Sequence, residues 1–271
     1  MQLGQPSRTA RAAAAHRAAH QILERGRIFA DPLALPILGE DAEALVREAE
    51  GDPSRRRLRL FIAVRTRFAE DALASAVERG VRQVVVLGAG LDTFAYRNPF
   101  GDRLRIFEVD HPATQAWKHQ RLADAAIPLP DSLTYAPVDF DRDTLSGGLL
   151  AAGFDPTQQT FFTWLGVVPY LAEETVWATL AFITSLPNGA HVVFDYSDPP
   201  NSLSPEARIL HDRRATHVEA LGESFVTHFE AEILRFRLIA LGPPQISARY
   251  FPNRGGAAPN KGGHILRATT V

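Results

Sequence analysis

The chain has 271 residues, of which 45% are hydrophobic and 22% charged, and its formal net charge is −2. These values are ordinary for a globular protein, and the charge predicts no general attraction to nucleic acid or to an anionic membrane surface. Cysteine is absent, which excludes disulfides and thiolate metal sites and fits a cytoplasmic location. No apolar run approaches the roughly 20 residues that a membrane-spanning helix needs, so no membrane partner is expected.

Residues 1–53 are predicted to form an N-terminal helical cap on a main domain of residues 54–271. Residues 8–27 are rich in Ala and Arg and contain no acidic residue before Glu24. Taken alone, this composition resembles an organelle transit peptide. The high helix propensity of its alanines instead favours an amphipathic helix. Pro32 and Pro36 then break the chain into short pieces. These pieces are expected to fold over the functional site of the main domain.

A long helix is predicted from Ser54, its expected N-cap, to about residue 79. Arg65 lies close to the apolar face of this helix, whereas Arg59 and Arg67 can reach water. A guanidinium placed like that of Arg65 either packs its stem on the core or holds a carboxylate through two parallel hydrogen bonds. The residues expected on the buried face are Leu60, Phe61, Val64, Phe68, Ala72 and Leu73.

A glycine turn follows the first predicted strand of the main domain. Residues 83–87 are a continuous run of β-formers, which is typical of a strand buried on both faces of a parallel sheet. Gly88, Ala89 and Gly90 come directly after it. Glycines in this position allow a tight turn and the close approach of a ligand to the backbone. A structural turn without any ligand also stays open.

Asp110 closes the second predicted strand, residues 104–109, and follows Gly90 by 20 residues. This is the separation at which a nucleotide-binding sheet places a carboxylate beneath ribose hydroxyls. The dinucleotide fingerprint G-x-G-x-x-G is incomplete, because Thr93 stands where its third glycine would be. A nicotinamide-dependent oxidoreductase therefore has only these two glycines and Asp110 in its favour.

A third predicted strand, residues 133–138, ends in Asp139 and Phe140, after a helix over residues 113–123. A carboxylate at this strand end can accept a hydrogen bond from an adenine amine, while Phe140 covers the ring. Asp139 could instead cap a turn.

The second half of the chain continues to alternate predicted strands with predicted helices, and then ends in two consecutive strands. Two strands at the end, with no helical pattern between them, predict an antiparallel hairpin on an otherwise parallel sheet. Such an ending suits the α/β fold of a class I methyltransferase better than that of a nicotinamide dehydrogenase. The elements expected here are strands 161–165 and 191–196, helices 173–185, 201–219 and 230–241, and strands 245–250 and 263–269.

The stretch VVVLGAGLDTFAYR, followed by FEVDHPATQAWK, resembles the bacterial branch of the leucine carboxyl methyltransferase-like family of S-adenosylmethionine-dependent O-methyltransferases. SRTARAAAAHRAAH, FADPLALPILG, FFTWLGVVPYL and HILRATTV fit the same branch, so the resemblance covers nearly the whole chain. It implies a class I methyltransferase sheet of order 3-2-1-4-5-7-6, with the last strand antiparallel and an N-terminal helical cap.

The resemblance also implies a site for S-adenosyl-L-methionine. In the family, an arginine that matches Arg65 grips the carboxylate of the methionine portion, and a tyrosine that matches Tyr170 lies near the acceptor. Many members carry glutamate where Leu165 stands, and that glutamate holds the cofactor's amino group. A catalytically silent, cofactor-binding relative is therefore an alternative. The residues expected to bind the cofactor are Arg65, Gly88, Ala89, Gly90, Asp110, Asp139 and Phe140.

The predicted activity is O-methylation of a hydroxyl or carboxyl group on a small molecule in specialised metabolism. Relatives that methylate a C-terminal leucine carry arginine two positions after the third-strand aspartate, where this chain has Asp141, so a peptide acceptor is not expected. No catalytic base can be assigned, and the nine histidines form no pattern typical of a metal site. A homo-oligomer is left open.

Overall fold

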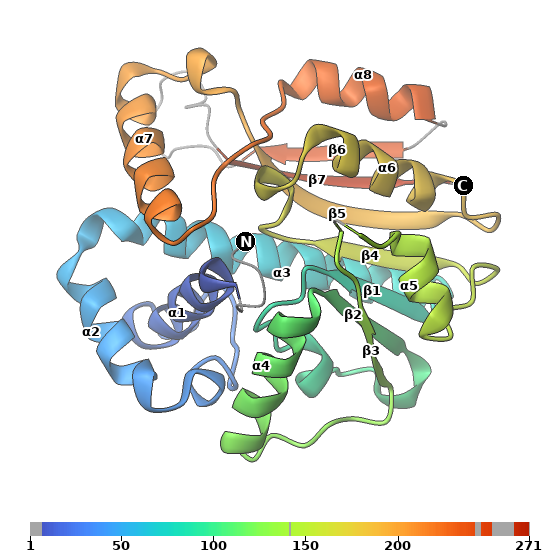
Figure 1. The fold of residues 1–271 in the computed structure, drawn as a ribbon, viewed down its shortest axis with the longest axis horizontal. Coiled ribbons are helices and arrows are strands. Elements are labelled where there is room, and N and C mark those ends of the chain that lie inside the picture. The colour runs from blue at the N-terminus through green and yellow to red at the C-terminus, as the bar shows by residue number, and fades with distance from the viewer. Residues whose placement is uncertain (1–6, 141, 242–244, 251–262, 271) are drawn as a thin grey trace.

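The computed structural model describes residues 7–140, 142–241, 245–250 and 263–270 (Figure 1). Its strands form one mixed sheet in the order β3-β2-β1-β4-β5-β7-β6. Neighbouring strands are parallel except that β7 runs antiparallel to both β5 and β6. The predicted order and the antiparallel last strand are therefore confirmed. The strands are β1 (Gln83–Leu87), β2 (Arg105–Asp110), β3 (Leu133–Pro137), β4 (Thr160–Trp164), β5 (Ala190–Ser197), β6 (Gln245–Tyr250) and β7 (Gly263–Thr269).

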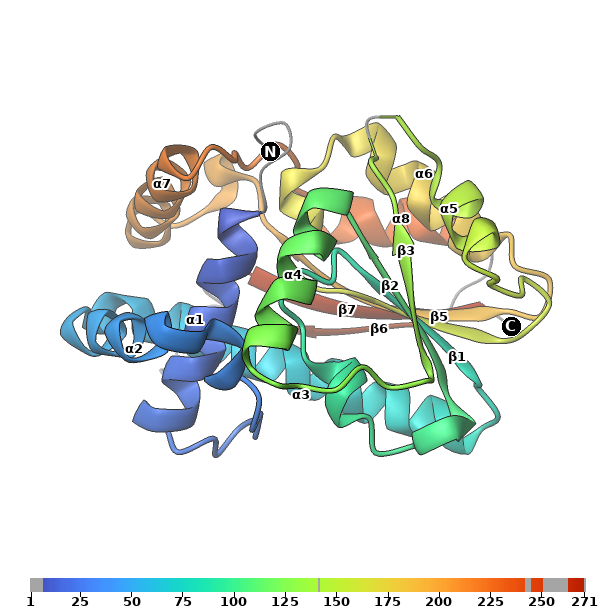
Figure 2. The same cartoon turned by 60° about the horizontal axis from the view of Figure 1, so that its bottom comes forward.

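Helices cover both faces of this sheet (Figure 2). Helix α3 (Arg56–Glu78) packs on one face, against alternate residues of β1, β2 and β4. On the other face lie α5 (Leu145–Ala151), α6 (Glu173–Thr184) and α8 (Ala231–Leu241). Helix α4 (Pro112–Asp124) lies beside β3. The short helix α5 was not predicted, because two adjacent glycines interrupt its helical pattern.

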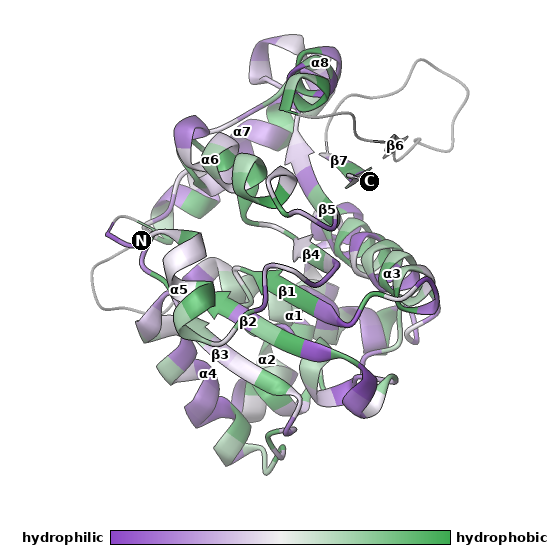
Figure 3. Cartoon of the chain, turned by 90° about the vertical axis from the view of Figure 1, so that its right-hand side faces the viewer, coloured by the Kyte–Doolittle hydropathy of each residue, from purple (hydrophilic) through white to green (hydrophobic). Residues whose placement is uncertain are grey.

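The hydrophobic residues gather on the strands, whereas the helices carry both polar and apolar residues (Figure 3). All five residues of β1 are buried, as a strand covered on both faces requires. In the part of the chain that the structure describes, no helix has the length and apolar character needed to cross a membrane.

The N-terminal segment forms its own small core at one end of the sheet. Its elements are α1 (Arg8–Leu23), η1 (Pro36–Asp41), α2 (Ala42–Gly51) and η2 (Pro53–Arg55). They bury a cluster of apolar residues together with Leu91, after the glycine turn, and Leu122 of α4. Figures 1 and 2 place α7 (Pro205–Ala220) at the same end of the molecule. The remaining short helices are η3 (Phe94–Arg97), η4 (Gly101–Arg103), η5 (Val168–Tyr170) and η6 (Pro200–Ser202).

Two expectations about the long helix were wrong. Ser54 is not its N-cap: the side chain of Asp52 accepts a hydrogen bond from the Ser54 N–H at 3.1 Å and begins η2, which leads into α3. Arg59 does not reach water, because α1 packs against α3. It is 4% exposed, and Glu24 accepts two hydrogen bonds from it, at 2.8 and 2.9 Å.

The buried face of α3 is turned from the expected one by this packing. Leu60, Phe61, Val64 and Phe68 are only partly buried. The fully buried apolar residues are Ile62, Ala63, Ala69, Ala72, Leu73, Ala76 and Val77.

Candidate functional site

The predicted site residues follow the carboxyl ends of neighbouring strands. Because parallel strands place these ends at one edge of a sheet, the residues that follow them form a row. The row contains Asp139 and Phe140 after β3, Asp110 at the end of β2, Gly88, Ala89 and Gly90 after β1, and Tyr170 after β4. Arg65 reaches the same edge from α3, through a contact with Asp195 of β5.

The glycine turn needs glycine for reasons internal to the protein. Gly88 has φ +64° and Gly90 has φ +47°, values that side chains strongly disfavour. A Cβ on Gly88 would lie 2.3 Å from a methyl of Val167, and one on Gly90 would lie 2.8 Å from the Cβ of Ala10. Ala89, between them, is buried. The glycines therefore shape this edge, but their presence alone does not show that a ligand binds there.

Asp110 is held by backbone donors on either side of it. Its Oδ2 accepts the Gly90 N–H at 2.6 Å, and its Oδ1 accepts the His111 N–H at 2.7 Å. Burial raises the pKa of Asp110, and these two N–H groups oppose that rise. The carboxylate is thus fixed beside the glycine turn, while its residue remains partly accessible. It can accept hydrogen bonds from a ligand's hydroxyl groups.

His111 links the two predicted carboxylates. Its Nδ1 accepts the Ala113 N–H at 3.1 Å and caps α4, which leaves the proton on Nε2. That Nε2 lies 3.8 Å from the Asp139 carboxylate, while the His111 N–H holds Asp110. The structure therefore brings Asp110 and Asp139 to the same place. Phe140, next in the chain, is partly buried against the core.

Thr93 stands where the dinucleotide fingerprint would have a glycine, and the structure shows its role. Its hydroxyl donates a hydrogen bond of 2.8 Å to Asp31 of the N-terminal segment. The Asp31 side chain is completely buried and also contacts Arg17 at 3.4 Å and Arg97 at 3.6 Å. Arg17 in turn donates to the carbonyl of Leu91. The N-terminal segment is thereby fastened to the end of the glycine turn.

Arg65 lies beside the ends of β4 and β5. Its Nη1 donates to Asp195 at 2.8 Å, and the other oxygen of Asp195 accepts the Gly166 N–H at 2.5 Å. The guanidinium lies over Gly166 so closely that a Cβ there would be 2.6 Å from Nη2. The Nε of Arg65 is buried without a hydrogen-bond partner among the described residues. Arg65 can therefore still donate to an anion.

Leu165 packs against the face of the sheet that α3 covers, so its side chain offers nothing to a polar ligand. A carboxylate is nevertheless present nearby, because Asp195 contacts the backbone of the next residue, Gly166.

Tyr170 ends η5 and faces a segment from the C-terminal half of the chain. Its ring centroid lies 5.3 Å from that of Phe225. This segment is fastened to η5, because the Val226 and Thr227 N–H groups donate to the Pro169 carbonyl at 2.8 and 3.2 Å. Burial raises the pKa of Tyr170 to about 12. Its hydroxyl therefore stays protonated and can donate a hydrogen bond to an acceptor molecule.

The first turn of α1 lies across both ends of the row. The Ser7 N–H donates to Thr114 of α4 at 3.3 Å. The hydroxyls of Ser7 and Thr9 donate to the Glu223 carboxylate at 3.0 and 2.7 Å. Since Ala10 also contacts Gly90, α1 covers the glycine turn and joins α4 to the segment that carries Phe225.

Arg214 and Arg65 lie within electrostatic reach of Tyr170. Burial is the main cause that lowers the pKa of His16, to about 4, and several arginines, including Arg214 and Arg65, lower it further. The Nδ1 atom of His16 is buried without a partner among the described residues. Arg214 of α7 lies 5.7 Å above the Phe225 ring.

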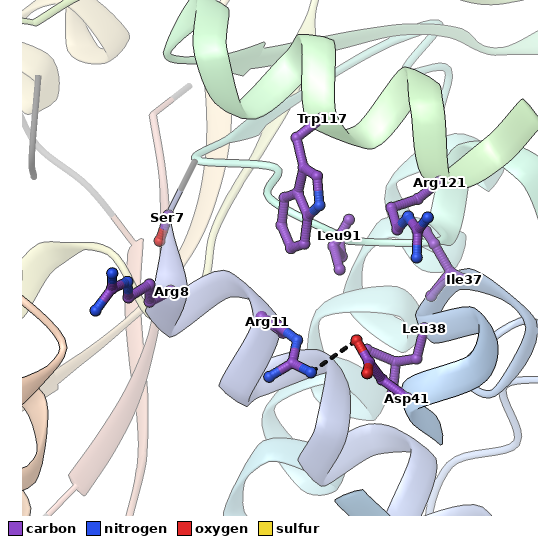
Figure 4. Close-up of a pocket in the computed structure, with 9 residues that line it drawn as sticks. All are labelled: Ser7, Arg8, Arg11, Ile37, Leu38, Asp41, Leu91, Trp117 and Arg121. Carbon is purple, nitrogen blue, oxygen red and sulfur yellow. Dashed lines mark ion pairs between the residues drawn. The ribbon is translucent and has the colours of Figure 1, made fainter. Parts of the chain in front are cut away.

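A separate cavity of about 200 Å³ opens between α1, η1 and α4 (Figure 4). It touches the glycine turn only through Leu91, and none of the predicted site residues lines it. Trp117 and Arg121 reach it from α4, and Arg11 and Asp41 form an ion pair of 2.7 Å at its edge. The residues described contain no group of three or more His, Asp or Glu side chains that could hold a metal ion.

The sequence did not single out several residues of this site. Asp195 could have been found, because it lies near the end of the fifth strand as Asp110 and Asp139 follow the second and third. His111 directly follows Asp110 and precedes a proline, which is a helix-start signal. Nothing in the sequence marks Arg214 or Phe225: Arg214 is one of several arginines in a polar helix.

Comparison with known proteins identifies the family. Residues 10–184 match the family described as Leucine carboxyl methyltransferase. A Bacillus subtilis protein, YktD, provisionally named an S-adenosyl-L-methionine-dependent methyltransferase, is 41% identical over 136 residues, 49% of this chain. A Mycobacterium marinum protein with the same provisional name is 34% identical over 197 residues, 68% of this chain. The matches span 44% and 64% of the length of these two relatives.

Solved structures support the fold. A DUF574 family protein from Streptomyces avermitilis aligns with a TM-score of 0.54 and 17% identity, over 93% of this chain and 95% of that one. The methyltransferase domain of bacterial CtHen1 aligns with a TM-score of 0.50 and 12% identity, over 74% of this chain and 97% of that one. The family match covers more than half of the chain, and the chain therefore belongs to the leucine carboxyl methyltransferase family.

Proposed function

We propose that the chain is an S-adenosyl-L-methionine-dependent methyltransferase that methylates an oxygen atom of a small molecule. The observation that carries the proposal is the convergence of Asp110 and Asp139 beside the glycine turn, with Arg65 further along the same edge. The names of the relatives support the cofactor, and the antiparallel β7 supports a methyltransferase sheet over the all-parallel sheet of a dinucleotide-binding domain.

The residues present fit this cofactor. Asp110 would accept hydrogen bonds from the ribose hydroxyls, while Asp139 and Phe140 would contact the adenine. The unpartnered Nε of Arg65 would donate to the methionine carboxylate, and Asp195 fixes the guanidinium that carries it. When bound, the cofactor supplies a methyl group that its sulfonium already activates.

With an activated methyl group, the protein has mainly to align donor and acceptor, which can lower a barrier by roughly 7–11 kcal/mol. Residues 1–53 would act as the cap that excludes water, since α1 covers the glycine turn. Tyr170 would contact the acceptor. A carboxylate acceptor is ionised at neutral pH and needs no general base, whereas a hydroxyl would usually need one. Asp141 stands where relatives that methylate a C-terminal leucine carry arginine, and it lies outside the described residues.

Isothermal titration with S-adenosylmethionine and S-adenosylhomocysteine tests the proposal. Micromolar binding of both, lost in Asp110→Ala, is expected. Absence of binding at millimolar ligand would contradict it. Transfer of a deuterated methyl group to small molecules of a bacterial extract, followed by mass spectrometry, then identifies the acceptor. Binding without any methylated product would instead favour the catalytically silent relative that Leu165 suggests. The cytoplasmic location and the oligomeric state stay predictions.

A further inference from the structure

Arg214 has no carboxylate partner within the described part of the chain. Its side chain is exposed to solvent, and its guanidinium carbon lies 5.7 Å from the centroid of the Phe225 ring. A cation over an aromatic ring at this distance gains little at an accessible position and leaves the hydrogen-bond donors of the guanidinium free. An arginine with free donors is suited to bind a carboxylate through two parallel hydrogen bonds.

Charged and polar groups of other elements lie within electrostatic reach of the exposed Arg214 guanidinium. They are Tyr170, Asp195, Arg65 and Arg57. Arg65 is already paired with Asp195 at 2.8 Å, whereas Arg214 forms no ion pair with the residues described.

A second observation also indicates a ligand. The Nδ1 atom of His16 and the Nε atom of Arg65 are both buried without a hydrogen-bond partner in the described chain. Buried polar groups are nearly always paired, with protein, water or ligand. His16 lies within the electrostatic reach of Arg55, Arg59, Arg214 and Arg65.

Aromatic rings complete the arrangement. The Phe225 ring lies 5.3 Å from that of Tyr170 and 6.0 Å from that of His211. Phe225 and Tyr170 are each partly accessible. They offer an apolar surface directly beside the guanidinium, which suits a molecule with an anionic end and an aromatic body.

We propose that Arg214 binds a carboxylate carried by the methyl acceptor, whose aromatic body packs against Phe225 and Tyr170. Arg214 would thereby determine which acceptors enter, selecting acidic aryl compounds over neutral ones. This inference rests on the proposed methyltransferase function for the role of the bound molecule, but the binding itself can be measured without any methyl transfer.

The test compares three aryl carboxylates of increasing length, benzoate, phenylacetate and 3-phenylpropionate, each with its neutral carboxamide. Binding to the full chain is measured by titration calorimetry, with and without S-adenosylhomocysteine. We expect at least one acid to bind about tenfold more tightly than its amide, because the amide has nearly the same shape but lacks the charge and the second acceptor oxygen that Arg214 would bind. Arg214→Gln should abolish this preference. Arg213→Gln, which removes the exposed neighbouring arginine, should keep it.

Cofactor binding and thermal unfolding of each variant provide the controls. Arg214→Gln should bind S-adenosylhomocysteine and unfold as the unaltered protein does. The inference is overturned if no acid is preferred over its amide, or if Arg214→Gln keeps the preference. Failure of the unaltered protein to bind the cofactor would instead contradict the methyltransferase proposal, while the acid preference still decides the role of Arg214.

Discussion

The strand-end row and the cover over it are built on different principles. In the row, which runs from Asp139 to Tyr170, the positions of the polar groups are set by the sheet, because each follows a strand. In the cover, which comprises α1, α7 and residues 222–230, the contacts join segments distant in the chain, as when Ser7 and Thr9 bind Glu223. The comparison teaches that the strand ends position most of the groups proposed for the cofactor, with Arg65 added from α3. The groups proposed for the acceptor come from both regions, with Tyr170 in the row and Arg214 and Phe225 in the cover.

A substitution of Asp31, which fastens the N-terminal segment to the end of the glycine turn, should have the largest effect on stability. Asp31→Ala removes a completely buried carboxylate and leaves Arg17, Thr93 and Arg97 without it. We expect the free energy of unfolding to fall by about 3–5 kcal/mol, because breaking a buried ion pair leaves uncompensated charge. Urea denaturation measures this. Asp41→Ala, which breaks the exposed pair with Arg11, should cost under about 1 kcal/mol; equal losses in the two variants would refute the assignment.

Within the row, Asp110→Asn should weaken cofactor binding by roughly ten- to a hundredfold, because hydrogen bonds to a charged group contribute about 1.5–3 kcal/mol. Titration with S-adenosylhomocysteine measures the change. Asp102→Asn alters an exposed carboxylate of η4 and should bind as before. Unchanged affinity in Asp110→Asn would remove the carboxylate from the proposed site.

Beneath the row, Glu108 should make stability depend on pH. It is fully buried, 2.7 Å from Lys118, and burial raises its pKa from 4.5 to about 7, against the opposing effect of Lys118. Between these values the carboxyl is ionised in the unfolded chain but still protonated in the folded one. The free energy of unfolding therefore falls as pH rises through this window, by up to about 1.4 kcal/mol per pH unit.

Glu108→Gln should make this dependence shallower. Urea denaturation at several pH values between 4.5 and 7 measures it, with Glu78→Gln, an exposed site on α3, as the control that keeps the original slope. The same slope in Glu108→Gln would show that other groups cause the dependence.

In the cover, Glu223→Gln should have the smallest effect. It replaces a carboxylate that accepts from Ser7 and Thr9 with a neutral amide, so we expect a loss of about 1 kcal/mol or less in unfolding free energy. Amide hydrogen exchange in the first turns of α1 should change more clearly than the free energy of unfolding. It should become faster, because Glu223 no longer holds these turns as firmly. Glu219→Gln, an exposed change on α7, should leave this exchange unaltered. No difference between the two variants would mean that Glu223 does not hold α1.

The same comparison explains how far sequence reasoning could go. The strand-end positions of Asp110 and Asp139 were predictable, because buried strands and the residues that end them leave a local pattern. The strand order was predicted only through the resemblance to a known family. Arg59 was misplaced because its burial depends on Glu24, which is 35 residues away and directly follows α1. Arg214, Phe225 and Tyr170 lie in different segments with no shared pattern, so only the folded chain shows that Phe225 lies beside both of the others.

Helix α1 has a practical consequence for inhibitor design. Its first turn contacts Thr114 on one side and Glu223 on the other, with Gly90 beneath it. A compound that links an adenosyl group to an acidic aryl group would occupy both regions below a single helix. Because even a Cβ on Gly90 would lie 2.8 Å from the Cβ of Ala10, its tether could not pass between these residues, and binding would require the first turn of α1 to move.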